Sequence, residues 1–409
     1  MIIYPLVGVK KMPTFVSPKT VYFGEDALDQ FESIKGQKCF IVTDKILVKL
    51  GIVKILTDKL QEFEKSWEIF DGVEPDPHED TILKAKELCA KFEPDLIIGL
   101  GGGSSLDAAK AVWFLYEHDD FGIDDLNPFE DLHMGIKAKC VAIPTTSGTG
   151  AEATWAVIVT RTDEDGLQSK LEQAHFDVLP TYAIVDPIFT TNLPQSLTVA
   201  TGFDALAHSC EGLVSEWKND LADGMCLHAI SLVKQYLPMV VEDGKNQLAR
   251  EKMANAATIA GLGFGNSQVT IGHSLGHSLG AVFHITHGIS VGVVLPYILQ
   301  FYLNNSDDDS ATIILGLAAK KTGIAQWDDD NKQAAHKLIE YIVSLQKQLN
   351  FPSKLSECGI TREQLDSQMG RLVDLTNESA SITMSPRDAS DDEIQKLLEY
   401  VFEGTMIDF

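Results

Sequence analysis

One carboxylate and a group of histidines constrain this chain more than any other feature, because separate stretches must fold so that these side chains meet. They are Asp204, His208, His273, His277, His284 and His287. The first two are four residues apart with no helix breaker between them, and the next two repeat the spacing. On an α-helix this spacing places both side chains on one face, about one turn apart. The pattern therefore predicts facing helices with these polar side chains between them.

These side chains are typical ligands of a divalent metal. One carboxylate and several imidazoles suit a borderline ion such as Fe²⁺ or Zn²⁺. A single histidine on an apolar helix is more often a packed core residue, but here four of the eleven histidines fall within residues 273–287. We therefore expect a metal site, and the spacing leaves open which histidines bind the ion.

Before residue 187 the sequence alternates between short apolar runs and amphipathic segments. The expected strands are 14–24, 38–43, 67–70, 94–100, the start of 140–152, 153–160 and 182–186, and the expected helices are 25–35, 45–65 and 78–92. Apolar runs such as P-D-L-I-I-G-L (94–100) are typical of strands buried on both faces. The alternation predicts right-handed crossovers and a parallel sheet with flanking helices. The acidic residues 117–136 are expected to form a surface loop, and residues 163–166 a polar turn.

From Pro187 onward strand patterns become scarce and helical patterns dominate. The expected helices are 196–216, 220–236, 246–264, 267–283, 290–304, 311–322, 331–349, 362–375 and 391–403. We therefore expect two domains: an α/β dinucleotide-binding domain over 1–189 and an all-helical, metal-binding domain over 190–409. A site between two such domains is common in cofactor-dependent enzymes.

The expected strand 94–100 runs into a glycine-rich turn, G-G-G-S-S-L-D-A-A-K (101–110). Glycines let a backbone approach a ligand closely, and the following helix offers free N–H groups and its positive end, which suits a pyrophosphate. The turn lacks the G-x-G-x-x-G pattern, so a plain tight turn is the alternative. The loop P-T-T-S-G-T-G-A-E (144–152) follows another expected strand, and its hydroxyl and amide groups could bind a phosphate, a ribose or the nicotinamide.

Charge and composition narrow the range of partners. The chain has 409 residues and a formal net charge of −26, which argues against nucleic acid and against an anionic membrane surface. The six cysteines are scattered singly without a C-x-x-C motif, so we expect reduced thiols. The first apolar run precedes its lysines, the reverse of a signal peptide, and no apolar run has the length of a membrane span. A cytoplasmic enzyme is therefore expected.

Together these motifs resemble the iron-dependent (group III) alcohol dehydrogenase family, over nearly the whole chain. The matching segments are V-T-D (42–44), D-G-V-E-P-D-P (71–77), the turn 101–110, the loop 144–152, A-I-V-D-P (183–187), T-G-F-D-A-L-A-H-S-C-E (201–211), the stretch 272–288 and S-P-R-D-A-S (385–390). Their order and spacing carry the resemblance, because no single motif is specific. It implies the dehydroquinate synthase-like architecture of that family and a reversible transfer of hydride between a small alcohol and NAD.

The resemblance also implies a role for each candidate residue. The metal ligands would be Asp204, His208, His273 and His287, and His284 would not bind the metal. His277 would lie beside the nicotinamide and the substrate, where it could relay a proton or only orient a neighbour. Phe264 would face the substrate. The cofactor would be bound by Gly101, Gly102, Gly103, Ser104, Asp107, Thr145, Thr146, Thr149 and Lys170.

Asp44 bears on the choice of cofactor. A carboxylate at the end of its strand can accept hydrogen bonds from ribose hydroxyls and would repel a 2′-phosphate, so NAD is expected rather than NADP. The alternative role for Asp44 is that of a helix N-cap. Two residues depart from the family pattern: Asp76 stands where an asparagine is usual beside the adenosine, and Ser105 replaces a proline in the glycine turn. Asp76 adds negative charge near the cofactor.

The expected reaction uses the metal as a Lewis acid on the substrate oxygen, with Fe²⁺ favoured over Zn²⁺ by the resemblance.

The same scaffold also carries glycerol dehydrogenases and 3-dehydroquinate synthase, a lyase, but the full set of one aspartate and three histidines favours the alcohol dehydrogenases. A metal-dependent hydrolase is a further alternative, although it would not need the loops 101–110 and 144–152. A non-catalytic binding protein would normally have lost ligands. The family suggests a homodimer or a larger homo-oligomer.

Overall fold

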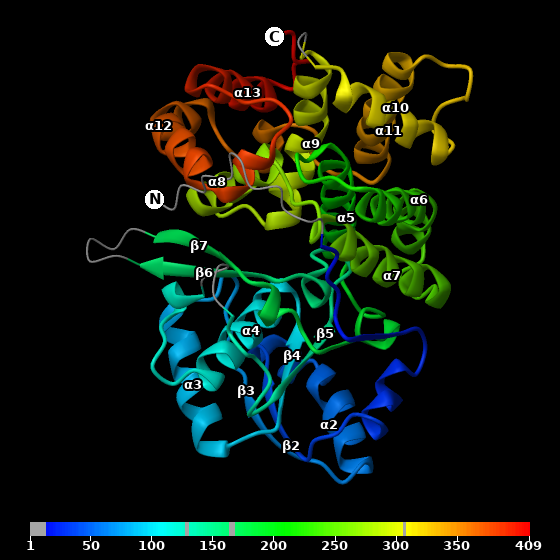
Figure 1. Ribbon diagram of the computed structural model, residues 1–409. Coiled ribbons are helices and arrows are strands. Elements are labelled where there is room, and N and C mark those ends of the chain that lie inside the picture. The colour runs from blue at the N-terminus through cyan, green and yellow to red at the C-terminus, as the bar shows by residue number, and fades with distance from the viewer. Residues whose placement is uncertain (1–13, 127–130, 163–167, 306–307) are drawn as a thin grey trace.

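The computed structural model describes residues 14–126, 131–162, 168–305 and 308–409. Its strands are β1 (Thr20–Phe23), β2 (Lys38–Val42), β3 (Ser66–Phe70), β4 (Leu96–Gly101), β5 (Lys139–Pro144), β6 (Ala156–Thr162), β7 (Gln168–Ala174) and β8 (Tyr182–Val185). Its helices are α1 (Lys45–Lys49), α2 (Ile52–Glu62), α3 (Glu79–Phe92), α4 (Gly103–Glu117), α5 (Gln195–Val214), α6 (Asp220–Glu242), α7 (Gln247–Phe264), α8 (Ile271–Phe283), α9 (His287–Leu303), α10 (Ser310–Lys321), α11 (Asn331–Gln348), α12 (Arg362–Glu378) and α13 (Asp391–Glu403). The strands and α1–α4 form one half of the molecule, and the later helices form the other (Figure 1).

Six strands form one parallel sheet in the order β1-β8-β5-β4-β2-β3. The strand β4 is buried along its whole length, because helices cover both faces of the sheet. Ile97 packs with α3 and α4 on one face, whereas Leu96 and Ile98 pack with α2 on the other. This explains the continuous apolar run in the sequence. The expected fold class, a parallel sheet with flanking helices followed by a helical half, is confirmed.

The order of the strands reverses between β2 and β4. After β2 the chain adds β3 on one side and then returns to place β4 on the other side of β2. Open α/β sheets bind their ligands at the carboxyl ends of strands at such a reversal. Asp44 follows β2, the turn 101–103 ends β4, and the loop 145–149 follows β5. Three of the segments expected to bind the cofactor therefore share this edge of the sheet.

One expectation about the strands is wrong. Residues 153–160 were expected to join the main sheet, but β6 instead pairs in antiparallel register with β7, and the two strands form a separate sheet. The segment that forms β7, Q-S-K-L-E-Q-A, is too polar for a strand buried on both faces, and its strand character escaped prediction. The hairpin lies between the two halves, beside α8 (Figure 1). The expected turn 163–166 falls outside the described residues.

Several helix predictions are right in position but wrong in length. The single helix expected over 45–65 is broken at Gly51, whose φ of 76° is left-handed, so that α1 and α2 form instead. The segment 25–35 forms only a short 3₁₀ helix, Ala27–Glu32. The helix expected over 267–283 begins later, at Ile271. Gly51 permits the break between α1 and α2, and the polar residues before Ile271 delay the start of α8. The spacing of apolar residues along the sequence does not show either change.

The acidic segment 117–136 is less exposed than its composition suggests. Ile123, Leu126 and Leu132 are buried. The carboxylate of Glu117 accepts hydrogen bonds from the backbone N–H groups of residues 136–138. The expected surface loop is present in the described part of this segment, but it is anchored, because Ile123, Leu126 and Leu132 pack into the core of the first half.

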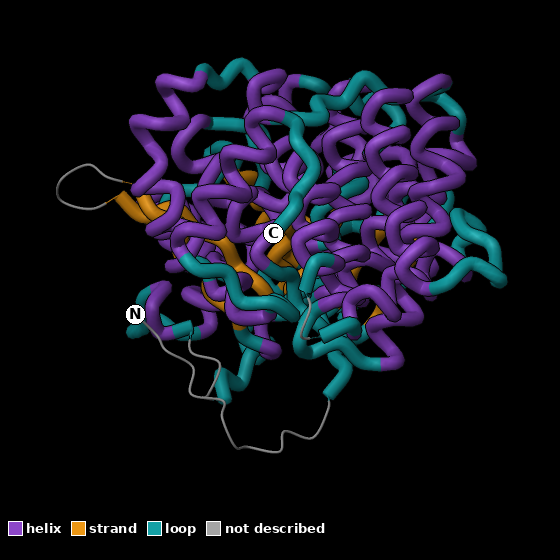
Figure 2. The backbone as a smooth tube through the Cα atoms, turned by 90° about the horizontal axis from the view of Figure 1, so that it is seen from above, coloured by secondary structure: helices purple, strands orange, loops and turns teal. Residues whose placement is uncertain are grey.

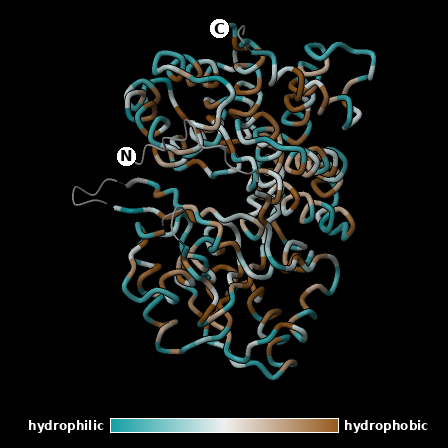
Figure 3. Tube along the Cα trace, viewed as in Figure 1, coloured by the Kyte–Doolittle hydropathy of each residue, from teal (hydrophilic) through white to brown (hydrophobic). Residues whose placement is uncertain are grey.

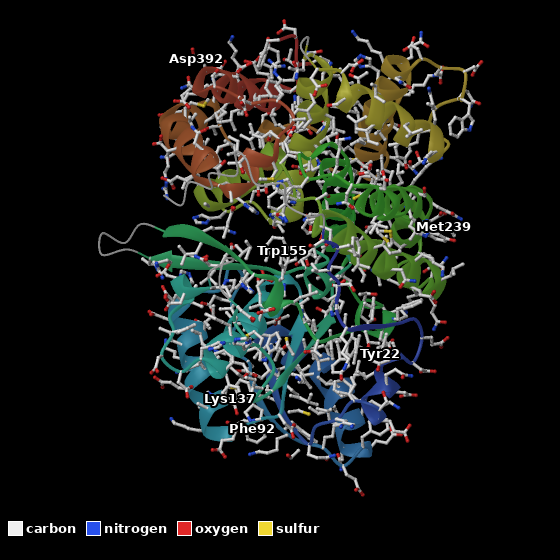
Figure 4. The ribbon with its side chains drawn as sticks, viewed as in Figure 1. Tyr22, Phe92, Lys137, Trp155, Met239 and Asp392 are labelled. Atoms are coloured by element: carbon white, nitrogen blue, oxygen red, sulfur yellow. The ribbon has the colours of Figure 1, made fainter. Side chains whose placement is uncertain are left out.

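The helical half is built from amphipathic helices, along which apolar and polar residues alternate (Figure 3). Within the described residues, α6 alone is long and apolar enough to meet a length-and-composition test for a membrane span. Its buried residues recur every three or four positions, at Ala222, Cys226, Ile230, Val233 and Leu237, and they face α5 and α7. Met239 lies on the outer side of the helix and is 38% exposed (Figure 4). This is the pattern of a helix packed on a folded bundle.

The two halves touch directly at the loop that follows β5. A Cβ atom on Gly150 would lie 2.7 Å from the carbonyl oxygen of Ala257 in α7, and Gly150 has a left-handed φ of 59°. Only glycine meets both demands without strain. Trp155, which lies between the halves in Figure 4, donates a hydrogen bond of 2.5 Å from its indole to the carbonyl oxygen of Gly265. Seen from above, the helical half lies over most of the strands, and some strand segments reach beyond it at the left (Figure 2).

A buried ion pair anchors the hairpin to the sheet. Lys110 on α4 is fully buried, and its ammonium group lies 3.1 Å from Asp107 Oδ1 and 3.0 Å from the carbonyl oxygen of Ala156. The other oxygen of Asp107 accepts a hydrogen bond of 3.2 Å from the N–H group of Ile158. Both charged side chains thus bind the backbone of β6, which fixes the base of the hairpin on α4.

We expect Lys110→Met to destabilise the protein by roughly 3–5 kcal/mol, because the carboxylate of Asp107 would stay buried without its positive partner. The measurement is urea unfolding at fixed metal and cofactor content. The matched control is Lys54→Met, which breaks an exposed pair with Asp58 at 2.6 Å and should cost no more than about 0.5 kcal/mol. Equal losses in the two variants would contradict the prediction.

Candidate metal centre and cofactor cleft

Four side chains from three helices converge at one place in the helical half: Asp204, His208, His273 and His287. The first two lie on α5, the third lies on α8, and the fourth is the first residue of α9. Their possible ligand atoms all lie within 4.8 Å of one another. A Cβ atom on Gly288 would lie 2.4 Å from the carbonyl oxygen of Ala200, so glycine is what lets α9 begin this close to α5.

The geometry of this cluster fits a single ion. Asp204 Oδ1 lies 3.5 Å from His208 Nδ1 and 3.4 Å from His287 Nε2. It lies 4.0 Å from His273 Nε2. Ligand atoms at about 2.1 Å from a tetrahedral ion are roughly 3.4 Å apart. Three of these atoms, on Asp204, His208 and His273, are buried without a hydrogen-bond partner among the described residues. Buried polar atoms rarely lack a partner, so the site is suited to an ion.

Two members of the cluster, Asp204 and His208, are in the protonation states that metal binding requires. Burial lowers the pKa of His208 to about 3, which keeps its imidazole neutral and its lone pair free. Burial would raise the pKa of Asp204, but the neighbouring imidazoles of His208 and His287 outweigh it, so that this pKa lies well below its usual range. Metal ligands must be deprotonated. The cluster therefore presents one negative carboxylate and a neutral imidazole from the same face of α5.

Glu211, which was missed in the sequence, supports this cluster from outside. It lies on α5, is 1% exposed, and accepts a hydrogen bond of 2.6 Å from His273 Nδ1. Its other oxygen accepts bonds of 2.8 and 2.6 Å from the N–H and hydroxyl groups of Thr270. Burial opposes the positive charge of His273, but Glu211 outweighs it and raises the pKa of that imidazole. The carboxylate fixes the imidazole so that Nε2 points to the cluster.

The structure separates the two histidines that the spacing left open. His284 ends α8 in a left-handed conformation, with φ of 56°, and its side chain lies outside the cluster. His277 lies beside the cluster: its ring centroid is 5.2 Å from that of His287 and 6.0 Å from that of His273. Its Nδ1 atom lies 2.8 Å from Glu172 Oε1 on β7, a second carboxylate that the sequence analysis did not single out.

Phe264 lies against the metal cluster. It is the last residue of α7, and its ring stacks on that of His208 with a centroid distance of 4.0 Å and an interplanar angle of 12°. The stacked ring fixes the orientation of the imidazole and supplies an apolar wall next to it. Its expected contact with the substrate stays a prediction.

The glycine turn and the threonine loop lie side by side at the carboxyl edge of the sheet. The N–H group of Thr145 donates to the carbonyl oxygen of Gly101 at 2.9 Å. A Cβ atom on Gly103 would lie 3.0 Å from Thr149 Cγ2, and one on Gly102 would lie 3.4 Å from Thr146 Cγ2. The glycines thus keep the start of α4 open between two backbone loops. Free N–H groups at such a helix start suit an anionic group.

Asp44 occupies the position of a helix cap. Its Oδ1 atom accepts hydrogen bonds of 2.8 and 2.9 Å from the N–H groups of Ile46 and Leu47, at the start of α1. This is the alternative role that the sequence allowed. Both described bonds use one oxygen, and the carboxylate is only half-buried at the sheet edge. The cap therefore leaves a second oxygen with which the side chain could meet a ribose.

Two acidic residues of the cleft are paired with lysines. Asp76 forms a very short ion pair with Lys170 on β7, which brings together two of the positions expected near the cofactor. Partial burial would raise the pKa of Asp76, but the charge of Lys170 outweighs it and lowers that pKa. The N–H group of Asp76 also lies 3.4 Å from Ser104 Oγ. Asp107 points instead to Lys110 and β6, so its described contacts position the hairpin.

The C-terminal motif S-P-R (385–387) supports the same helices. Ser385 Oγ accepts a hydrogen bond of 3.0 Å from the N–H group of Ile271, the first residue of α8. Arg387 donates to the carbonyl oxygens of Phe301 and Phe409 at 2.8 and 3.2 Å. The motif therefore caps the start of the helix that carries His273 and ties the chain end to α9.

Comparisons with known proteins agree with this arrangement. Residues 18–187 match the family model described as iron-containing alcohol dehydrogenase, and residues 198–402 match the model for the C-terminal part of the same family. The NADPH-dependent butanol dehydrogenase of Clostridium saccharobutylicum is 35% identical over 400 residues, which are 97% of this chain and 100% of the relative.

Two further similarities concern length and structure. The bifunctional aldehyde-alcohol dehydrogenase AdhE of Escherichia coli (strain K12) is 32% identical over 411 residues, which cover 95% of this chain and 46% of the relative, so the chain spans about half of that protein. The crystal structure of a 1,3-propanediol oxidoreductase matches with a TM-score of 0.87 at 27% identity, over 96% of this chain and 100% of the other.

We expect Glu211→Gln to lower metal affinity by about 10- to 100-fold, because His273 would lose the anionic partner that orients it. Competition with a chelator measures the affinity. The control is Glu216→Gln, an exposed glutamate just beyond the same helix, which should leave the affinity unchanged. An unaltered affinity in the Glu211 variant would show that the carboxylate does not support the site.

Proposed function

The chain belongs to the iron-containing alcohol dehydrogenase family, and we propose that Asp204, His208, His273 and His287 hold the metal ion of this enzyme. It is an alcohol dehydrogenase that uses a metal and a nicotinamide cofactor to interconvert a small alcohol and its carbonyl compound. The observation that carries the assignment is the set of buried ligand atoms without hydrogen-bond partners. Fe²⁺ is the proposed ion because of the family, although the same ligands also accept Zn²⁺.

The reaction would take place where the metal cluster faces the carboxyl edge of the sheet. The bound ion supplies Lewis acidity toward the substrate oxygen. Phe264 covers one side of His208 and keeps water from that side of the site. His277 lies beside the cluster, and its Nδ1 atom is hydrogen-bonded to Glu172. We propose that its Nε2 atom accepts the proton of the alcohol during oxidation and returns it during reduction. A nicotinamide bound beside the cluster would supply or accept the hydride.

The proposed dinucleotide site follows the edge of the sheet. The pyrophosphate would bind at Gly101, Gly102, Gly103 and Ser104, where α4 begins. Thr145, Thr146 and Thr149 would line the other wall of the cleft, and Lys170 would lie near the nicotinamide half. We propose that Asp107 orients this helix through Lys110 and does not contact the cofactor directly.

We propose NAD as the preferred cofactor because of Asp44. Its carboxylate stands at the end of β2, where a ribose would lie, and a 2′-phosphate there would be repelled. The butanol dehydrogenase relative is named as NADPH-dependent, so this preference needs its own test. If the enzyme prefers NADP, Asp44 does not select the cofactor and serves only as the N-cap of α1.

The names of the relatives suggest the size of the substrate. They point to short primary alcohols and diols, such as butanol and 1,3-propanediol. We also propose a homo-oligomer, a cytoplasmic location and a domain boundary near residue 190, with domains 1–189 and 190–409, as the sequence suggested. The butanol dehydrogenase and the 1,3-propanediol oxidoreductase named above favour an alcohol dehydrogenase over the lyase and the hydrolase.

The experiment that tests the function removes the metal and restores it. We expect metal-free protein to be inactive and to recover NADH-producing activity with short alcohols after anaerobic addition of Fe²⁺, with Zn²⁺ as the comparison. Asp204→Asn should lose bound metal and lower activity by at least about 100-fold, because the Lewis acid is lost. Absorbance of NADH and metal analysis give the two readouts.

Two controls belong to this experiment. His284→Asn, outside the cluster, should keep both metal and activity, and asparagine tolerates the left-handed conformation at this position. Metal-free Asp204→Asn should be at least as stable as metal-free wild type, because a neutral amide replaces a buried charge. Full metal content in the Asp204 variant would refute the assigned ligand set, and turnover without net NADH would point to the lyase.

We expect Asp44→Ser to raise the ratio of kcat/KM for NADP over NAD by at least about tenfold, because the charge that would repel a 2′-phosphate is removed. Serine is also a good N-cap, so the start of α1 should stay intact. Asp44→Ala removes both charge and cap and should also cost about 0.5–2 kcal/mol in stability. If the ratio does not change in the serine variant, Asp44 does not select the cofactor.

A further inference from the structure

The strand β7 belongs to the first half of the molecule, but one of its side chains is held by the second half. Glu172 Oε1 lies 2.8 Å from His277 Nδ1 on α8 and 3.0 Å from Ser379 Oγ, which follows α12. Its Oε2 atom accepts a hydrogen bond of 3.1 Å from the N–H group of Ala380. All three donors therefore come from the helical half.

The contacts fix which nitrogen of His277 carries a proton. The side chains of Glu172 and His277 are 16% and 15% exposed, so water competes little for their hydrogen bond. Burial would raise the pKa of Glu172, but the bonds from His277 and Ser379 outweigh it and lower that pKa, which keeps the carboxylate ionised. An ionised carboxylate only accepts hydrogen bonds, so Nδ1 must donate. The neutral imidazole then has its lone pair on Nε2.

We propose that Glu172 is a positioning residue for His277: from the opposite half of the molecule, it holds the imidazole in the Nδ1–H tautomer and in one orientation beside the metal cluster. This inference rests on the proposed function only where it predicts turnover. The tautomer and the orientation do not depend on turnover. Glu172 plays for His277 the part that Glu211 plays for His273, with the difference that Glu211 and His273 lie in the same half.

The same strand also reaches the cofactor side of the cleft. Lys170 lies two residues before Glu172, so both side chains project from one face of β7. Lys170 pairs with Asp76 in the first half, whereas Glu172 binds the second half. A change in the separation of the halves would therefore change the distance from Glu172 to His277. The proton-handling nitrogen would be correctly placed only when the two halves are together.

A role in merely tying the halves together is the competing explanation, and a double-mutant cycle separates the two. We expect Glu172→Ala and His277→Ala each to lower kcat by about 100-fold, through misplacement or loss of the imidazole. The double variant should be no worse than His277→Ala alone, since Glu172 would act only through that ring. KM values and metal content should change by less than about twofold. Multiplying losses would overturn the proposal.

The strand offers matched controls. Gln173→Ala alters the next residue of β7, whose side chain projects from the opposite face, and should leave kcat unchanged. Glu172→Asp keeps the charge on a shorter side chain and should restore part of kcat relative to Glu172→Ala. Loss of activity in the Gln173 variant, or no recovery with aspartate, would count against a specific role for the carboxylate.

A readout without turnover keeps this inference distinct from the proposed function. In Zn²⁺-loaded protein, ¹⁵N NMR of the imidazole should show His277 as the Nδ1–H tautomer, and Glu172→Ala should convert it to a mixture or to the other tautomer. An Nε2–H tautomer in the wild type would overturn the inference even in an active enzyme. An enzyme that is inactive with every alcohol would refute the function, and the NMR result would still decide the role of Glu172.

Discussion

The arrangement of helices around the candidate metal site depends on the buried carboxylate of Asp204. Asp204 is 1% exposed in the middle of the helical half, and a carboxylate so placed is strongly destabilising unless a positive partner is present. The imidazoles around it cannot all supply that charge, because burial holds His208 in its neutral form. A cation at the cluster would satisfy the carboxylate and the unpaired ring nitrogens together. We therefore infer that the close approach of α5, α8 and α9 serves to bind an ion, while Glu211 and Ser385 hold the surrounding elements in place.

The second constraint is the edge of the parallel sheet. The reversal of strand order between β2 and β4 creates a place for a ligand, and the chain directs that place toward the metal cluster by two contacts between the halves. One contact is the close packing of Gly150 on α7, and the other is the hairpin β6–β7, whose base is fixed by the buried pair of Lys110 and Asp107. The first contact joins the loop after β5 to α7, and β7 packs beside α8, so both connect the first half to helices next to the metal cluster.

The sequence predicted what repeats locally and missed what depends on distant partners. The apolar run of β4 and the periodic helices were correctly placed, since burial imposes their patterns directly. The hairpin strand β7 was missed because a polar strand has no apolar pattern. Glu211 and Glu172 were missed because their histidine partners lie 62 and 105 residues away. A buried glutamate one turn after His208 was nevertheless a usable signal. The structure also separated His284 from the cluster, since α8 ends there in a left-handed residue.

A protein with a net charge of −26 would be expected to repel an anionic dinucleotide. The charges close to the proposed cofactor site reduce this repulsion. Four carboxylates near the proposed cofactor site are already paired or hydrogen-bonded: Asp76 with Lys170, Asp107 with Lys110, Asp44 with the start of α1, and Glu172 with three donors. The field of distant surface charges is screened over about 10 Å at ordinary ionic strength. The pyrophosphate would therefore meet the free N–H groups at the start of α4 rather than the summed charge of the protein, and cofactor affinity should follow these few pairs.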